Sequence, residues 1–166
     1  MTNRSPQLVC VCGLPGVGKS TVSAAITERI DAVRFRTDAV RKELFENPLY
    51  TEDERKQVYD ELFDRTRTVL HDGTSVVLDG TFAEQERRTA IQDISRSHGV
   101  NFRLIQVVCD SAVAEERIAS RDDISDADVA VHREFKQEFE PIELEYQRVD
   151  NSGTLEQTRE QVSSLF

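Results

Sequence analysis

The stretch GLPGVGKST (residues 13–21) constrains the fold of this chain more than any other feature of the sequence. It matches the pattern G-x-x-x-x-G-K-[ST] at every fixed position. The apolar run LVCVC (8–12) precedes it, as expected for a strand buried on both faces, and a helical pattern follows over about 19–30. A chance match to the string rarely has this strand–loop–helix context. We therefore interpret the stretch as a phosphate-binding loop rather than a tight structural turn.

Each residue type in this loop has a physical reason. Glycines permit backbone angles and a close approach that a side chain would block, and the turned amides then point at phosphate oxygens. The following helix adds its positive N-terminal end. We expect Lys19 to reach the β- and γ-phosphates of ATP and Ser20 to ligate Mg²⁺. The residues expected to contact ATP in this segment are Gly13, Pro15, Gly16, Val17, Gly18, Lys19, Ser20 and Thr21.

The rest of the chain alternates apolar runs with helical segments. Further strands are expected at 33–36, 75–79, 102–110 and 148–150. Helices are expected at about 38–45, from 51–54 to Gly73, from 81–84 to Gly99, and at 111–121, 132–146 and 154–166. Strands that alternate with helices imply a parallel sheet with right-handed crossovers. The predicted fold class is α/β, a three-layer α/β/α sandwich in a single domain spanning residues 1–166.

Three of these helices rest on local signals that the structure can test. Two begin with the Ser/Thr-x-x-Glu form of a capping box, TEDE (51–54) and TFAE (81–84). The helix over 132–146 rests on apolar and aromatic side chains spaced three and four apart, and Pro141 is expected to kink or restart it.

Ligands of open parallel sheets bind beyond the carboxyl ends of the strands. Gly13 follows the first expected strand, Asp38 follows the second and Asp79 ends the third. We therefore expect these three residues to lie along one edge of the sheet.

The composition narrows the class of protein. Asp and Glu number 31 against 21 Lys and Arg, for a net charge of −10, which argues against broad non-specific nucleic-acid binding. Only four of the cations are lysines. Such an acid excess is typical of proteins from a salt-rich cytoplasm, with an ordinary acidic enzyme as the alternative.

The location is expected to be cytoplasmic. The apolar runs are too short to span a bilayer, and the first residues, MTNRSPQ, contain no secretory signal. The cysteines Cys10, Cys12 and Cys109 sit in apolar runs and are expected to be reduced core thiols.

Two common classes of phosphate-loop protein are disfavoured. A GTPase switch needs a guanine-reading Asn-Lys-x-Asp, and no asparagine of this chain is followed by lysine. A motor ATPase often carries Asp-Glu at the end of its Mg²⁺ strand, whereas Gly80 follows Asp79 here.

A kinase needs a carboxylate at the acceptor hydroxyl and a cation for the acceptor. Asp38 and Arg41 in TDAVRKEL (37–44) lie one helical turn apart, on one face of the predicted helix. Asp38 is a candidate general base, and Arg41 a candidate ligand for an anionic acceptor group. The alternative is a helix-capping aspartate with a local ion pair.

A kinase also uses mobile arginines that stabilise the transferred charge. Arg117 and Arg121 share a helix face directly before the polar break at 122–128, where a lid over about 121–135 would hinge. Arginine suits contact with adenine and with phosphate, and the alternative is a solvated face paired to neighbouring glutamates. In ERR (86–88), Arg87 or Arg88 faces either the acceptor or solvent.

These motifs together resemble the small P-loop kinases of the adenylate-kinase-like superfamily. They are most similar to AAA-type P-loop kinases related to the kinase domain of phage polynucleotide kinase. The resemblance covers nearly the whole chain. It is carried by GLPGVGKST, TDAVR, VVLDGTF with ERR, EERIASR and VDNS, in that order.

The resemblance implies a sheet ordered 2-3-1-4-5 and particular roles for the site residues. Asp38 would act as general base, Arg41 would contact the acceptor, and Asp79 would lie near the metal or the acceptor. Arg121 would support the transferring phosphate from the lid.

The predicted function is ATP- and Mg²⁺-dependent transfer of the γ-phosphoryl group to an acceptor hydroxyl, with a small molecule favoured over a polynucleotide 5′-hydroxyl. The alternatives are a non-catalytic nucleotide-binding regulatory module and a hydrolase-like switch.

Overall fold

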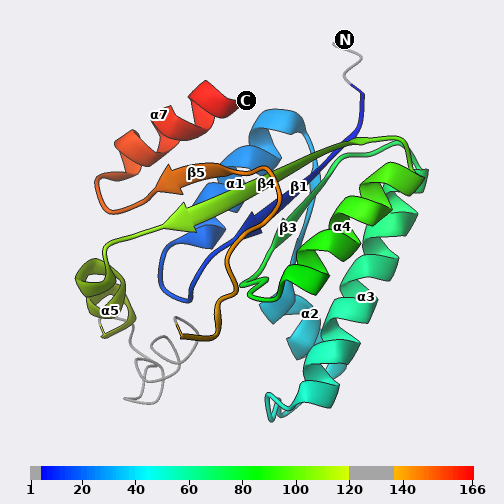
Figure 1. Cartoon of the computed structure of the whole chain (residues 1–166), viewed down its shortest axis with the longest axis horizontal. Helices are drawn as coiled ribbons and strands as arrows, with labels where there is room; N and C mark the ends of the chain where they lie inside the picture. The colour runs from blue at the N-terminus through cyan, green and yellow to red at the C-terminus, as the bar shows by residue number, and fades with distance from the viewer. Residues whose placement is uncertain (1–4, 120–136) are drawn as a thin grey trace.

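The computed structural model describes residues 5–119 and 137–166, which form a five-stranded sheet with helices on both faces (Figure 1). Its strands are β1 (Gln7–Cys12), β2 (Val33–Arg36), β3 (Val76–Asp79), β4 (Asn101–Val108) and β5 (Gln147–Asp150). They lie in the order β2-β3-β1-β4-β5, and every neighbouring pair is parallel. The predicted fold class and sheet order are confirmed.

The helices form the two outer layers. They are α1 (Lys19–Ile30), α2 (Thr37–Leu44), α3 (Glu52–His71), α4 (Gln85–Ser97), α5 (Ser111–Ala119) and α7 (Leu155–Leu165). Helices α1 and α7 cover one face of the sheet, and α3 and α4 cover the other (Figure 1). Within the described ranges, no helix has the length and apolar character needed to cross a bilayer.

The core is split by the central strand β1. Leu8, Cys10 and Cys12 pack into the cluster on the α3 and α4 side, whereas Val9 and Val11 pack on the α1 and α7 side. This explains the unbroken apolar run, because a strand covered on both faces has no solvent side. Cys10 and Cys12 share a face as the period of a strand requires, and burial raises the pKa of Cys12 to about 12.

The capping box predicted at TEDE is confirmed, whereas the one predicted at TFAE is wrong. The Thr51 hydroxyl oxygen accepts a hydrogen bond from the Glu54 amide, and the Glu54 carboxylate accepts one from the Thr51 amide. Helix α4 instead begins at Gln85, and no side chain caps it. The preceding residues form a loop at the end of β3, in which Phe82 is fully buried at a φ of 45°.

The helix predicted over 132–146 is wrong for its described part from residue 139 onward, which is non-helical up to β5. Arg88 supplies the physical reason. Its guanidinium is fully buried and donates to the carbonyl oxygens of Glu140 and Pro141 at 2.7 and 3.2 Å, which a helix would have used internally. Phe139, Ile142 and Leu144 nevertheless pack against the core, so the apolar spacing in this segment reflects packing of a non-helical chain.

Candidate active site

The phosphate-binding loop joins β1 to α1 and depends on three glycines. Gly13, Gly16 and Gly18 have φ angles of 152°, 83° and 92°. A methyl group added to Gly13 would lie 2.5 Å from the Val107 carbonyl oxygen, and one added to Gly16 would lie 2.7 Å from Ile118 Cδ1. Both the backbone angles and the close packing therefore require glycine.

The loop offers donors that fit a polyphosphate. Within the described part of the chain, no hydrogen bond is donated by the amides of Gly16, Gly18 or Ser20. Lys19 Nζ folds over the loop and donates to the Leu14 carbonyl oxygen at 2.9 Å. These donors stand at the N-terminus of α1, where the helix dipole adds positive potential. The cradle thus suits the phosphates of ATP.

Asn151 holds the loop from the end of β5. Its Nδ2 donates to the Val17 carbonyl oxygen at 2.9 Å, and its Oδ1 accepts from the Thr158 hydroxyl at 2.6 Å. Arg117 Nη2 donates to the Asn151 carbonyl oxygen at 2.7 Å, so α5 is tied to the same junction. Arg117 therefore lies beside the loop, and its contact with the nucleotide stays a prediction. Reasoning from spacing missed Asn151, and the VDNS motif was its only signal.

Asp79 ends β3 and is buried beside α1. Its Oδ2 accepts from the Ser23 hydroxyl at 2.6 Å and lies 4.0 Å from Arg36 Nε. Ser20 lies one helical turn before Ser23. The described residues contain no cluster of three acidic, histidine or cysteine side chains that would hold a metal by themselves. Mg²⁺ is commonly held by one or two protein oxygens together with phosphates and waters, and Ser20 with Asp79 fits that requirement.

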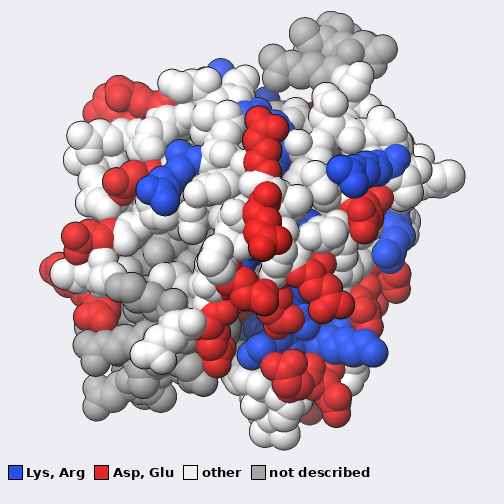
Figure 2. All heavy atoms as spheres, in the orientation of Figure 1, with Lys and Arg blue, Asp and Glu red and all other residues white. Residues whose placement is uncertain are grey.

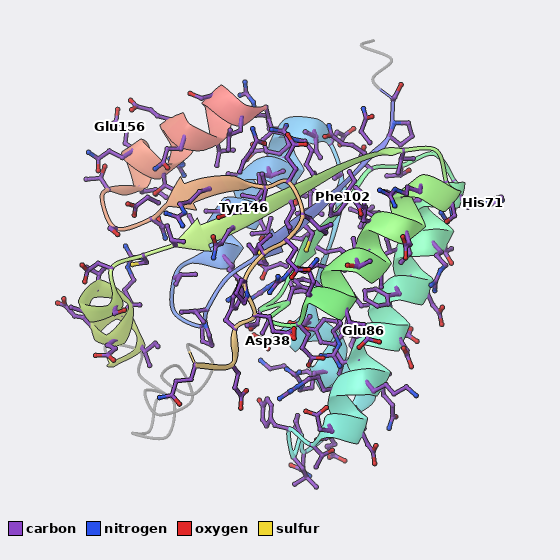
Figure 3. All side chains as sticks on the ribbon, viewed as in Figure 1. Asp38, His71, Glu86, Phe102, Tyr146 and Glu156 are labelled. Carbon is purple, nitrogen blue, oxygen red and sulfur yellow. The ribbon has the colours of Figure 1, made fainter. Side chains whose placement is uncertain are left out.

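Asp38 and Arg41 lie on the first turns of α2, next to the end of β2. The Asp38 carboxylate is 70% exposed, and its Oδ1 lies 3.2 Å from Arg41 Nη1. In Figure 3, Asp38 lies near the start of α2, below the ends of the strands. The local ion pair considered from the sequence is present. Asp38 does not cap the helix, however, and its exposure leaves the carboxylate accessible to a substrate.

The two arginines of ERR have different surroundings. Arg87 is 15% exposed, contacts Glu84 at 2.6 Å and stacks over the Tyr59 ring at 4.2 Å. Arg88 is fully buried and donates hydrogen bonds to backbone carbonyl oxygens of the loop after β3 and of the segment that precedes β5. The solvated surface considered for both is wrong for Arg88, which is structural.

Tyr59 is buried below Arg87, whose guanidinium carbon lies 4.2 Å from the centre of its ring. Burial raises the pKa of Tyr59, and the positive charges of Arg87 and Arg41 act in the opposite direction. A partly buried guanidinium group is well suited to an anionic ligand.

Two other predicted features lie outside the described residues, namely Arg121 and the lid over about 121–135. Tyr50 was not expected at the site, and no motif indicates it; the guanidinium carbon of Arg41 lies 4.9 Å from the centre of its ring. Arg34 was also missed. Its Nη1 donates to the Ser20 carbonyl oxygen at 3.1 Å and to the Ser23 hydroxyl at 3.2 Å.

This combination defines a class of protein. A glycine-rich phosphate loop follows the central strand of a 2-3-1-4-5 parallel sheet, and carboxylates follow β2 and end β3. That is the fold of the small P-loop kinases. More particularly, the chain belongs to the AAA domain family AAA_33, whose model matches residues 8–142.

Solved structures with this fold include several kinases. A gluconokinase from Sinorhizobium meliloti 1021 superposes with a TM-score of 0.72 and 20% identity, over 98% of this chain and 95% of that chain. The Mycobacterium tuberculosis APS kinase CysC, in complex with AMPPNP and APS, superposes with a TM-score of 0.75 and 16% identity, over 97% of both chains. At these identities, the likeness establishes the fold.

The similar curated proteins are longer than this chain. An uncharacterized protein of Mycobacterium tuberculosis, Rv2004c, is 31% identical over 126 residues, which are 65% of this chain and 25% of that protein. The 6-phosphofructo-2-kinase/fructose-2,6-bisphosphatase 1 of Rattus norvegicus is 26% identical over 168 residues, covering 88% of this chain and 36% of that protein. The chain thus spans about a quarter to a third of these relatives.

Proposed function

We propose that this protein is an ATP- and Mg²⁺-dependent kinase that transfers the γ-phosphoryl group to an acceptor hydroxyl. One observation carries the proposal. The exposed Asp38 carboxylate lies at the same edge of the sheet as the phosphate loop, with the Arg41 guanidinium beside it. A pure nucleotide-binding module has no need of an accessible carboxylate there. Similarity to kinase structures and to the rat kinase supports the same activity.

Each site residue has a role in this reaction. Lys19 and the loop amides hold the phosphate chain, while Ser20 and Asp79 hold the metal ion. The oxygen of the acceptor hydroxyl bonds to the γ-phosphorus while the bond from that phosphorus to the leaving oxygen of ADP breaks. Asp38 accepts the proton that the hydroxyl gives up. ATP supplies the phosphoryl group, and Mg²⁺ neutralises charge on the phosphates. Arg121 is proposed to stabilise the transferred charge, and Arg117 to border the nucleotide.

The acceptor is proposed to be a small molecule with an anionic group. Arg41 is a partly buried cation 3.2 Å from Asp38, and its guanidinium suits a carboxylate, sulfate or phosphate. Arg87, also partly buried, is proposed as a second contact for this group. On the face drawn in Figure 2, acidic side chains cover more of the surface than basic ones, and the basic groups are separated by acidic or uncharged side chains. A polynucleotide would need a continuous cationic track, so a 5′-hydroxyl kinase is the less favoured candidate.

We further propose that residues 1–166 act as one kinase domain with a lid over about 121–135, and that it works in the cytoplasm. A non-catalytic regulatory module is the rival function, and it predicts ATP binding without any acceptor-dependent release of ADP.

An acceptor screen with γ-labelled ATP tests the proposal. Small hydroxyl compounds with carboxylate, phosphate or sulfate groups are compared with nucleosides, sugars, adenylyl sulfate and 5′-hydroxyl oligonucleotides. We expect label transfer to at least one anionic small molecule, and none by Lys19→Ala. ADP release at the same rate with and without every acceptor would contradict the proposal and favour a hydrolase.

A further inference from the structure

The loop between α2 and α3 carries an unusual tyrosine. Tyr50 is 67% exposed and has a φ of 58°, a left-handed conformation that bulky side chains rarely adopt. Its neighbour Leu49 is also exposed. A residue held in such a conformation requires surrounding contacts that fix it, and residues of this kind cluster at functional sites.

Glu54 supplies those contacts from the first turn of α3. Its two carboxylate oxygens accept hydrogen bonds from the Leu49 amide at 3.0 and 2.8 Å, and one of them accepts from the Thr51 amide at 3.1 Å. These amides, with that of Tyr50, lower the pKa of Glu54. One buried carboxylate therefore holds the backbone on both sides of Tyr50.

The side chain of Tyr50 is directed at the proposed acceptor site. The Arg41 guanidinium carbon lies 4.9 Å from the centre of the Tyr50 ring, and Nη1 of the same guanidinium contacts Asp38. Arg41 Nε is buried and has no hydrogen-bond partner among the described residues. Among the described residues, the guanidinium is thus held between an aromatic ring and one carboxylate. Arginine stacks well on aromatic rings in this way.

We propose that Tyr50 is a positioning residue for the acceptor, which holds the Arg41 guanidinium in the orientation that binds the acceptor's anionic group. The ring of Tyr50 lies over Arg41 of α2 while its backbone is left-handed, and Glu54 holds the flanking amides of this loop. This inference rests on the proposed function only through the binding of an anion by Arg41.

The first test needs no known acceptor. The chain contains no tryptophan, so Tyr50→Trp places a single tryptophan, which can be excited selectively, over Arg41. Inorganic phosphate and sulfate are titrated at constant ionic strength, with the phosphate loop saturated by the ATP analogue AMPPNP. We expect a saturable fluorescence change that disappears when Arg41→Gln is added.

The matched control is Val33→Trp, at the opposite end of β2, which should show no saturable change. The inference is overturned if Tyr50→Trp gives no saturable change, or if the change persists with Arg41→Gln or appears equally in Val33→Trp.

The second test uses an acceptor from the screen. Tyr50→Ala should raise the KM for that acceptor roughly threefold to thirtyfold, the range expected for loss of a cation–π contact, with little change in kcat or in the KM for ATP. Tyr50→Phe should restore the wild-type KM because it keeps the ring. Leu49→Ala, in the same loop, should have no effect.

An equal fall in kcat for Tyr50→Ala and Tyr50→Phe, or an unchanged acceptor KM in Tyr50→Ala, would refute the positioning role. If no acceptor is phosphorylated, the proposed function fails, whereas the fluorescence titration still decides whether Tyr50 and Arg41 form an anion site.

Discussion

At the scale of single residues, Gly18 has two separate reasons to be glycine. Its φ is 92°, and an added methyl group would overlap with Asn151 Nδ2, which holds the phosphate loop. Gly73 has a similar φ of 83°, but a methyl group added to it would meet no atom within 4 Å. A substitution at Gly73 therefore measures the cost of the backbone angle alone. The pair can therefore separate backbone strain from the packing of the loop against Asn151.

We predict that Gly18→Ala lowers ATP affinity at least tenfold, because the methyl group displaces Asn151 and the loop with it. Gly73→Ala should cost about 1–2 kcal/mol of stability from its backbone angle and leave ATP affinity unchanged. Calorimetric titration with ATP and thermal unfolding measure both effects. Equal ATP affinity in Gly18→Ala and the wild type would show that the loop tolerates the displacement.

Arg88 was expected to face the acceptor or solvent, whereas the structure buries it. It makes five hydrogen bonds, four of them to backbone carbonyl oxygens. We predict that Arg88→Met lowers the free energy of unfolding by about 3–5 kcal/mol, because several buried carbonyl groups lose their donors. The control Arg96→Met, on the exposed face of α4, should change it by less than about 0.5 kcal/mol. Urea denaturation distinguishes the two, and similar small losses would contradict the structural role.

At the scale of elements, the start of α3 has a pH dependence set by Glu54. Amide donors, chiefly that of Leu49, lower the pKa of Glu54 from its usual value of 4.5. The folded state therefore prefers the ionised carboxylate. The contribution of the ionised Glu54 carboxylate to the free energy of unfolding is fully present above the usual pKa. It is lost as the pH falls through the lowered pKa of the folded state.

We predict that Glu54→Gln is less stable than the wild type at pH 7, and that the difference shrinks steadily as the pH falls below about 4.5. Thermal unfolding midpoints of both proteins between pH 7 and pH 3 measure it. A difference that stays constant over this range would show that Glu54 acts through packing rather than through its charge.

The same scale shows what local sequence patterns determine. The apolar run at 8–12, the glycine loop and the capping box at Thr51 are local signals, and the structure confirms all three. The box at 81–84 and the helix beyond residue 139 fail because distant partners decide those segments: Phe82 is drawn into the core, and Arg88 binds the carbonyl groups of 140 and 141.

The candidate site also contains contacts that the sequence predicts and contacts that depend on distant partners. Parallel topology brings Gly13, Asp38 and Asp79 to one edge, so their meeting was predictable from the order of strands and loops. Tyr50 reaches Arg41 across a turn whose shape depends on Glu54, and no spacing rule expresses that contact. Asn151 arrives from the end of the last strand, far away in the sequence.

At the scale of the whole molecule, the main electrostatic feature is the net charge of −10. Acidic side chains cover more of the face in Figure 2 than basic ones do, and ion pairs such as those of Arg55, Arg67 and Arg96 involve side chains exposed to water. Exposed pairs contribute little, whereas repulsion among like charges acts over the whole surface and is screened by salt.

We predict that the thermal unfolding midpoint rises between about 0.05 M and 1 M potassium chloride, where the Debye length falls from above 10 Å to about 3 Å. The rise should be smaller near the sequence pI of about 4.8, where the net charge is close to zero. A flat or falling midpoint at pH 7 would contradict a surface dominated by repulsion.

The central claim is that Asp38 serves phosphoryl transfer rather than nucleotide binding. Asp38→Asn keeps the size and the exposed position of the side chain but removes the base. With an acceptor from the screen, single-turnover transfer of the γ-phosphoryl group is measured alongside calorimetric ATP affinity. We predict that transfer slows by roughly 10²- to 10⁴-fold while ATP affinity stays within about twofold. Wild-type transfer by Asp38→Asn would contradict the account.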